Sequence, residues 1–334
     1  MLRRKLTVVF LLSALLIPSF VYGQNVYTAP PEVIAKIKDE GMNRSQVMQT
    51  LSYLTDVIGA RLTGSPALLN ANNWTKDTLS KWGLQNAHTE GWGPFGRGWT
   101  LKSFNAEVTA PYNIPLIAYP KAWSPSKSAV NADVVYLDVK TDADFDKYKG
   151  QLKDKIVLIS DIREIKADFD GMGRRFTDEE LAKMEAATPP TPGGQGQGQR
   201  PQGQAPQNFQ QQQQVAAKRF QFLLDEGAAV VVDGSARGSG GTLFVQGATV
   251  VQPPQVQGTP PTRIAAQSKD ADGRILPQVT VALEHYNRMI RMIQQGVKLK
   301  MSINIQAEYN DKDPMAYNTV AEIPGSDPKL KEEL

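Results

Sequence analysis

Apolar and polar residues alternate most regularly near the end of the sequence, between residues 297 and 306. The apolar positions of this stretch are Val297, Leu299, Met301, Ile303 and Ile305. A two-residue period is typical of a strand with one buried face. After the Asp313-Pro314 break, residues 317–323 predict a second strand that ends at Pro324 and Gly325.

Helical spacing dominates the first part of the sequence, from residue 30 to residue 82. Val33, Ile34 and Ile37 predict a short helix with one apolar face. Asn43, with Gln46 three residues later, resembles a capping box. It precedes a second apolar stripe over residues 47–58, which Gly59 ends.

A third helix is predicted from Ser65 to Gly83. Ser65 is a favoured N-cap, Pro66 suits the first helical turn, and Gly83 is a common helix stop. Residues 84–90 and 100–109 then predict strands, joined by an aromatic, Gly-rich loop. Helices followed by strands indicate an α/β or α+β domain.

The middle of the chain predicts a second set of elements. Its predicted strands cover residues 133–139, 155–160, 228–232 and 278–283, and its predicted helices cover 215–226 and 284–295. Residues 188–214 are dominated by Pro, Gly and Gln and predict a disordered loop, because they bury too little apolar surface to offset chain entropy. Residues 252–263 predict another surface loop.

The N-terminus has the organisation of a secretory signal peptide. Basic residues at 3–5 precede an apolar run over residues 6–17, and small residues precede Gln24. The alternative, a membrane anchor, needs about 18 or more apolar residues. We therefore expect cleavage near Gly23 and a secreted or periplasmic protein without a membrane span.

Charge and cysteine content exclude several classes of function. The net charge of +3 is carried by Arg3, Arg4 and Lys5, so the exported chain is neutral and has no basic excess that would indicate nucleic-acid binding. The sequence has no cysteine, which excludes disulfides, thiolate metal sites and a cysteine nucleophile.

Histidine limits the metal chemistry that the sequence can support. The two histidines are His88 and His285, and neither stands in a His-x-x-x-His or His-x-Asp motif. His88 and Glu90 would share one side of a strand, although a surface histidine is the simpler interpretation. His285 follows Glu284 at a predicted helix start, where a solvated role near the cap is expected.

Other chemical motifs are equally weak. Ser65, Ser235 and Ser239 lack the Gly-x-Ser-x-Gly context of a hydrolase nucleophile. Gly91-x-Gly93-x-x-Gly96 formally matches a dinucleotide fingerprint, but it contains Pro94 and leads into a strand, so an aromatic turn is predicted instead. Gly238-Ser239-Gly240-Gly241 lacks the Lys of a phosphate-binding loop.

The acidic groups of the sequence are interpreted as solvated faces. They lie at residues 142–146, 178–180 and 332–333. The residues therefore assign no catalytic, cofactor-binding or metal-binding position.

Four stretches together resemble one family. They are similar to segments of secreted zinc exopeptidases of the plasma glutamate carboxypeptidase (carboxypeptidase Q) type. The stretches are residues 54–66 (Leu-Thr-Asp-Val-Ile-Gly-Ala-Arg-Leu-Thr-Gly-Ser-Pro), the Trp-bearing predicted helix that ends at residues 81–84 (Lys-Trp-Gly-Leu), residues 95–99 (Phe-Gly-Arg-Gly-Trp) and residues 317–326 (Tyr-Asn-Thr-Val-Ala-Glu-Ile-Pro-Gly-Ser). The resemblance implies an incomplete α/β peptidase sandwich over residues 24–113 and 314–334. It also implies an inserted α+β protease-associated domain over residues 114–313.

The resemblance also implies zinc and short peptide substrates, and it is compatible with a homodimer. The family's metal ligands begin with a His-x-Asp motif that is expected downstream of Leu334, so no residue of this sequence is assigned to them. The expectation is an N-terminal portion of an amino- or carboxypeptidase that is inactive alone. The alternative is an exported, non-catalytic binding module built on the protease-associated domain.

Overall fold

A computed structural model describes residues 29–325 of the chain, apart from 168, 170–172, 188–207 and 255–262. Two compact units divide at Val57 and Ile58. The predicted signal peptide and most of the predicted disordered loop lie outside the described residues. Within those residues, no helix combines the length and apolar character needed to cross a membrane.

The first unit consists of α2 (Pro31–Asn43) and α3 (Val47–Ser52), and α3 continues as the π-helix η1 (Tyr53–Ile58). The predicted capping box at Asn43 is wrong. Asn43 is the last residue of α2, and its amide donates to Asp39 Oδ1 over 2.7 Å. Gln46 precedes α3 without a side-chain cap. Asn43 therefore ends one helix and does not start the next, and its side chain bonds four residues back along α2.

The second unit opens with α4 (Pro66–Lys81), as the sequence predicts. Ser65 Oγ accepts a hydrogen bond from Leu68 N at 3.2 Å, and Pro66 occupies the first turn. Gly83, with a φ of +92°, follows the helix in a conformation that favours glycine. Both helix ends are therefore encoded locally.

Beside α4 lies a two-stranded antiparallel ribbon of β1 (Gln85–Trp92) and β10 (Ala316–Glu322). These strands come from opposite ends of the second unit: Trp92 Nε1 donates to Asn318 Oδ1, 226 residues away. The chain between β1 and β10 forms a separate sheet.

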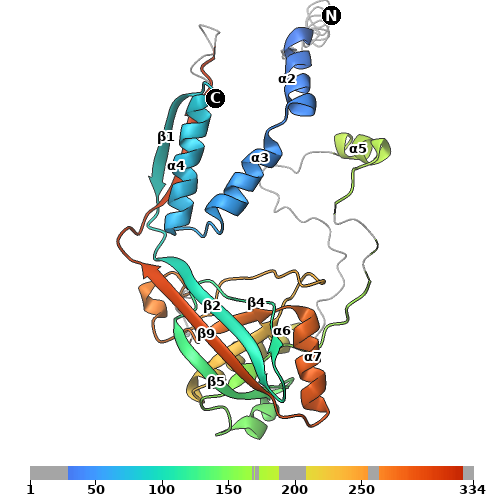
Figure 1. Cartoon of the computed structure of the whole chain (residues 1–334), viewed down its shortest axis with the longest axis vertical. Helices are drawn as coiled ribbons and strands as arrows, with labels where there is room; N and C mark the ends of the chain where they lie inside the picture. Colours follow the sequence, from blue (N-terminus) through green and yellow to red (C-terminus); the bar gives the residue numbers. More distant parts are fainter. Residues whose placement is uncertain (1–28, 168, 170–172, 188–207, 255–262, 326–334) are drawn as a thin grey trace, which may run out of the picture. The chain divides into compact units, whose positions relative to one another are not determined.

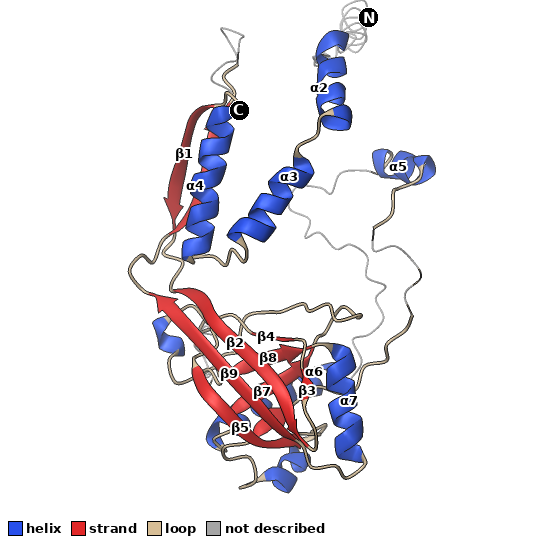
Figure 2. Ribbon diagram, viewed as in Figure 1, coloured by secondary structure: helices blue, strands red, loops and turns tan. Residues whose placement is uncertain are grey.

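That sheet has eight strands in the order β3-β2-β9-β5-β6-β7-β8-β4 (Figure 2). Its strands are β2 (Gly98–Ala110), β3 (Ile114–Pro115), β4 (Ala118–Pro120), β5 (Lys127–Tyr136), β6 (Ile156–Leu158), β7 (Val230–Gly234), β8 (Gln278–Val281) and β9 (Lys300–Asn310). The neighbours from β5 to β8 are parallel and the other pairs are antiparallel. The fold is thus α/β with a mixed, curled sheet. The predicted boundary at Ile114 lies inside this sheet, because β2 pairs with β9 from Gly98 onward.

Helices cover both faces of the parallel strands. Tyr286, Met289 and Ile290 of α7 (Leu283–Gln294) pack against one apolar cluster, which also contains Ile156 and Leu158 of β6. Val157 lies in the opposite cluster with Leu223 of α6 (Asn208–Asp225). Burial on both faces explains why β6 and β7 are apolar runs without alternation.

The remaining short helices are η2 (Asp142–Tyr148), α5 (Asp178–Glu185) and η3 (Lys269–Ala271). The predicted disordered loop over residues 188–214 is wrong at its end, because α6 begins at Asn208. Glutamine is a good helix former, so the Gln run extends the amphipathic helix backward from Val215.

Candidate functional site

Parts of the stretches that carry the family resemblance meet in the second unit, namely residues 58–66, 95–99 and 317–325. Gly64 and Gly98 come so close that a Cβ built on Gly98 would lie 1.9 Å from the Gly64 carbonyl oxygen. Asn310, at the end of β9, places its amide 3.4 Å from the same oxygen. Two glycines are needed here because two backbone segments approach within contact distance.

Asn72 connects α4 to β10. Its side-chain amide donates to the carbonyl oxygen of Tyr317 over 2.8 Å, and its own backbone carbonyl oxygen accepts from Thr319 Oγ1 over 3.1 Å. These two bonds hold α4 in register with β10. A long-range pairing of this kind has no local sequence signal.

A small cavity of about 100 Å³ lies at this convergence. It is lined by Gly64, Ser65, Pro66, Leu68, Leu69, Asn72, Asn310, Asp313, Met315, Ala316 and Tyr317. The N–H of Met315 and the hydroxyl of Tyr317 hold the pKa of Asp313 below its usual range, and Asp313 in turn raises the pKa of Tyr317. The Asp313 carboxylate, bonded to the Met315 N–H and the Tyr317 hydroxyl, fixes the turn before β10. A single carboxylate with these partners supplies neither a nucleophile nor a set of metal ligands.

A larger cavity of about 490 Å³, which we call the Arg61 groove, lies beside it and shares Ser65. It is lined by Ala60, Arg61, Leu62, Ser65, Ala67, Trp99, Thr100, Leu101, Tyr119, Pro120, Ala122, Val245 and Gln246. Its volume falls in the range of small-ligand sites. The groove is therefore a candidate for a small-ligand site.

Arg97 fixes the loop that leads into β2. The residue is 7% exposed, and its guanidinium forms two bonds to the carboxylate of Asp272 at 2.8 and 3.2 Å and one to the Ser268 carbonyl at 2.9 Å. It also stacks over the Tyr309 ring, 4.4 Å from its centroid. Planar two-point pairing combined with stacking is specific to arginine.

A second buried charge lies behind β4. Lys121 Nζ is 2.5 Å from Asp233 Oδ2, and Thr280 donates to Asp233 Oδ1 over 2.7 Å. Both oxygens of the Asp233 carboxylate are therefore paired. The cluster joins β7 and β8 to the residue after β4, and it stabilises the edge of the sheet.

The structure places the two histidines in unrelated surroundings. His88 Nδ1 lies 2.6 Å from the Asn86 carbonyl and Nε2 lies 3.1 Å from Glu90 Oε1, so the predicted neighbours on β1 do meet. His285 Nδ1 accepts a bond from the Ile117 backbone N–H at 3.1 Å. Each ring is thus engaged in a local hydrogen bond.

A zinc ion does not fit the side chains of the described residues. Within them, no group of three or more His, Asp or Glu residues could hold a metal. The nitrogen of His285 that faces the Ile117 backbone is already an acceptor, and the Glu284 carboxylate accepts from Gly240 N at 2.6 Å. Zinc sites use at least three protein ligands, and the part of the chain that the structure describes does not bring three together.

Two hydrogen bonds give His88 a testable pH dependence. The carbonyl of Asn86 and, next, the carboxylate of Glu90 raise the pKa of His88 above its ordinary value of 6.5. A raised pKa means that the protonated ring stabilises the fold. This stabilisation is present below about pH 6.5 and is lost as the pH rises through the higher pKa.

We expect an NMR titration of the His88 ring to show a midpoint above 6.5, and Glu90→Gln to lower it. Lys102→Met, which removes the Lys102–Glu308 pair on β2 and β9, is the control and should leave the midpoint unchanged. A His88 midpoint at or below 6.5 in the unmodified chain would contradict the expectation.

The remaining sequence motifs have structural roles. The stretch from Gly91 to Gly96 joins β1 to β2 without a helix, and Phe95 packs near Trp92 and Trp123, as the predicted aromatic turn requires. Ser235 Oγ donates to the Arg237 carbonyl and accepts from Phe244 N.

The acidic groups that lie within the described residues cap helices. Asp144 closes a capping box with Thr141 in η2, and Glu180 does the same with Thr177 at the start of α5. Hydrogen bonds and a nearby cation lower the pKa of both carboxyls. Residues 332–333 lie outside the described residues.

Comparisons with known proteins give matches among solved structures. A peptidase M28 precursor from Shewanella amazonensis SB2B has a TM-score of 0.48 and 17% identity, with 88% of this chain and 54% of that chain covered. An aminopeptidase from Aneurinibacillus sp. strain AM-1 has a TM-score of 0.39 and 14% identity, over 87% and 52% of the two chains. BSAP, a zinc aminopeptidase from Bacillus subtilis, has a TM-score of 0.41 and 11% identity, over 85% and 48%.

The chain spans about half the length of these structures. No protein-family model matches the sequence, and no curated protein matches it.

Proposed function

We propose that this chain is the part of an exported, zinc-dependent exopeptidase that supports the catalytic centre without holding the metal. The whole enzyme acts on short peptides. In this proposal α4, β1 and β10 belong to the peptidase domain, and a protease-associated domain is inserted between β1 and β10. The metal ligands belong to residues other than those described. The chain then shapes the approach to the catalytic centre and does not itself hydrolyse peptides.

The observation that supports this proposal is the pairing of β1 with β10 around a separate sheet. Two strands and a helix form one small layer, and the chain from Gly98 to Asn310 leaves and rejoins it. An inserted domain requires this arrangement, because its two ends must lie side by side in the host sheet. Gly98 and Tyr317, which belong to two of the stretches similar to secreted exopeptidases, lie where the chain leaves and rejoins this layer.

A hydrolysis assay tests the inactivity of the chain alone. The purified chain with added zinc should leave dipeptides and aminoacyl anilides intact, because its described side chains assemble no metal site. Hydrolysis that a chelator abolishes would contradict the proposal.

The peptidase lineage has its own test. Reading of the coding sequence past the codon for Leu334 should show a continuing frame with a strand followed by His-x-Asp. A stop codon directly after that codon would favour the non-catalytic binding module.

A further inference from the structure

The chain contains two Arg–Phe bonds that follow a second basic residue. Arg174-Arg175-Phe176 precedes α5, and Lys218-Arg219-Phe220 lies within α6. Endoproteases that recognise paired basic residues bind the two cationic side chains of an extended substrate segment in acidic pockets. Because the two sequences offer the same chemistry, the surrounding structure decides which of them such an enzyme can reach. A third basic run, at residues 3–5, lies outside the described residues.

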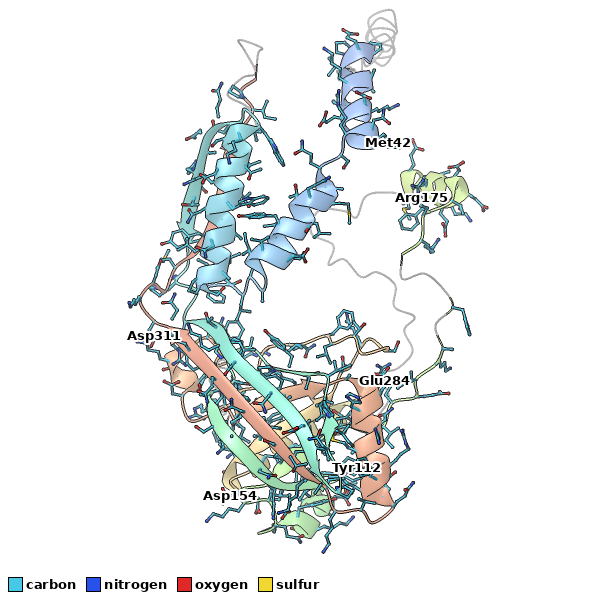
Figure 3. The ribbon with its side chains drawn as sticks, in the orientation of Figure 1. Met42, Tyr112, Asp154, Arg175, Glu284 and Asp311 are labelled. Atoms are coloured by element: carbon cyan, nitrogen blue, oxygen red, sulfur yellow. The ribbon has the colours of Figure 1, made fainter. Side chains whose placement is uncertain are left out.

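The first Arg–Phe bond lies in an exposed, irregular segment. Residues 173–177 belong to no helix or strand, each of them is exposed, and Arg175 stands just before α5 (Figure 3). Thr177, the N-cap of α5, has an extended backbone with φ −74° and ψ 160°. A protease can therefore bind the segment on both sides of the Arg175–Phe176 bond with little rearrangement.

The contacts that hold this segment are weak. Arg174 Nη1 donates to both oxygens of Glu180 over 2.8 Å, and the guanidinium lies 5.3 Å from the centroid of the Phe176 ring. The Arg174 and Glu180 side chains are 67% and 34% exposed, and an exposed pair of this kind contributes little to stability. α5, which the structure describes in full, has no buried residue, and a helix of eight residues is marginal in water. Its first turn can therefore unwind when a protease binds.

The second Arg–Phe bond is held inside α6. The backbone N–H and C=O groups of a helix interior are paired along the chain. The Arg219 guanidinium donates to the carbonyl oxygens of Ile159 and Val139, each over 3.1 Å. Phe220 packs against the buried cluster that contains Leu223. Cleavage here requires local unfolding of a packed helix, so the fold protects this bond and leaves the first one accessible.

A cut after Arg175 would fall between β6 and β7. The fragment that ends at Arg175 would hold β1 to β6, and the fragment that begins at Phe176 would hold β7 to β10. Strand pairs join the two fragments: β1 pairs with β10, β2 and β5 pair with β9, β4 pairs with β8, and β6 pairs with β7. The fragments are therefore interleaved and cannot separate without breaking both sheets.

We propose that the Arg175–Phe176 bond is a processing site for an endoprotease that recognises paired basic residues, and that the cut chain keeps its fold as two interleaved fragments. Water adds to the Arg175 carbonyl carbon, and the bond from this carbon to the Phe176 nitrogen breaks. The products are a carboxylate on Arg175 and an ammonium group on Phe176. This inference treats the chain as a substrate and is independent of the proposed exopeptidase function.

Digestion of the full chain with kexin, a serine protease that cleaves after paired basic residues, tests the site. Mass spectrometry should identify a first cut after Arg175, faster than the cut after Arg219 by about 100-fold or more, because cleavage follows the population of the open form. Arg175→Gln should slow this cut by about tenfold or more, because it removes the charge that the protease recognises.

Arg237→Gln is the matched control for the digestion. Arg237 is also exposed, in the loop after β7, but it has no second basic residue beside it, so its substitution should leave the rate of cleavage after Arg175 unchanged. A first cut at another bond, or equal rates after Arg175 and Arg219 in the folded chain, would overturn the inference.

The state of the cut chain is measured separately. The two fragments should elute together in size-exclusion chromatography and give the circular dichroism spectrum of the intact chain. The midpoint of thermal unfolding should rise more steeply with protein concentration than that of the intact chain, because folding now includes an association step. Separation of the fragments in buffer without denaturant would overturn the interleaved assembly.

Discussion

Gly98→Ala is expected to destabilise the second unit by about 3 kcal/mol or more. The added methyl group would lie 1.9 Å from the Gly64 oxygen and 2.5 Å from the Gly64 carbonyl carbon. Both are backbone atoms, so either the start of β2 or the loop before α4 must move. Urea unfolding followed by circular dichroism measures the change in the free energy of unfolding.

Gly173→Ala is the matched control. A Cβ at Gly173 meets no atom within 4 Å among the described residues, so the free energy of unfolding should change by less than about 0.5 kcal/mol. A Gly98→Ala variant as stable as this control would show that the two segments do not touch in solution.

Arg97→Met should destabilise the second unit by about 2–3 kcal/mol, and Arg97→Lys by less. The methionine fills part of the volume but leaves Asp272 and the Ser268 carbonyl without their partner. The side chain of Asp272 is 66% exposed, so water can solvate its carboxylate when the arginine is removed. The loss of unfolding free energy is therefore smaller than for a fully buried ion pair. Lysine keeps the charge but loses the two-point bond and the stacking on Tyr309.

Lys102→Met supplies the contrast on the same two strands, β2 and β9. Lys102 and Glu308 are more than half exposed although their charged atoms are 2.8 Å apart. Such a pair contributes less than about 1 kcal/mol. Equal losses of unfolding free energy for Arg97→Met and Lys102→Met would argue against a structural role for the Arg97 pairing.

Local patterns predicted several regular elements of this chain, although they missed β3, β4 and α5. The alternation that ends at Ile305 predicted β9, and Ser65 with Pro66 placed the start of α4 correctly, because a strand period and a helix cap are properties of neighbouring residues. The error at Asn43 also concerns neighbouring residues. The pattern paired Asn43 with Gln46 in a capping box, whereas Asn43 is the last residue of α2 and its amide bonds to Asp39.

The site could not be predicted in this way. Arg97 and Asp272 are 175 residues apart, and no local pattern indicates that they meet. The Arg61 groove joins the loop before α4, the edge strand β4 and the loop after β7, and these become neighbours only when the sheet has formed. Nothing in the sequence near Tyr119 or Val245 indicates that these two residues line the same cavity.

The pairing of β1 with β10 has a consequence for synthesis on the ribosome. Trp92 of β1 leaves the ribosome 226 residues before Asn318, its partner on β10. At about 5–20 residues per second, β1 waits roughly 10–45 seconds for that partner. During this interval its edge is open to β10 of a second, finished copy, and the exchanged ribbon would link the nascent chain to that copy in a swapped dimer.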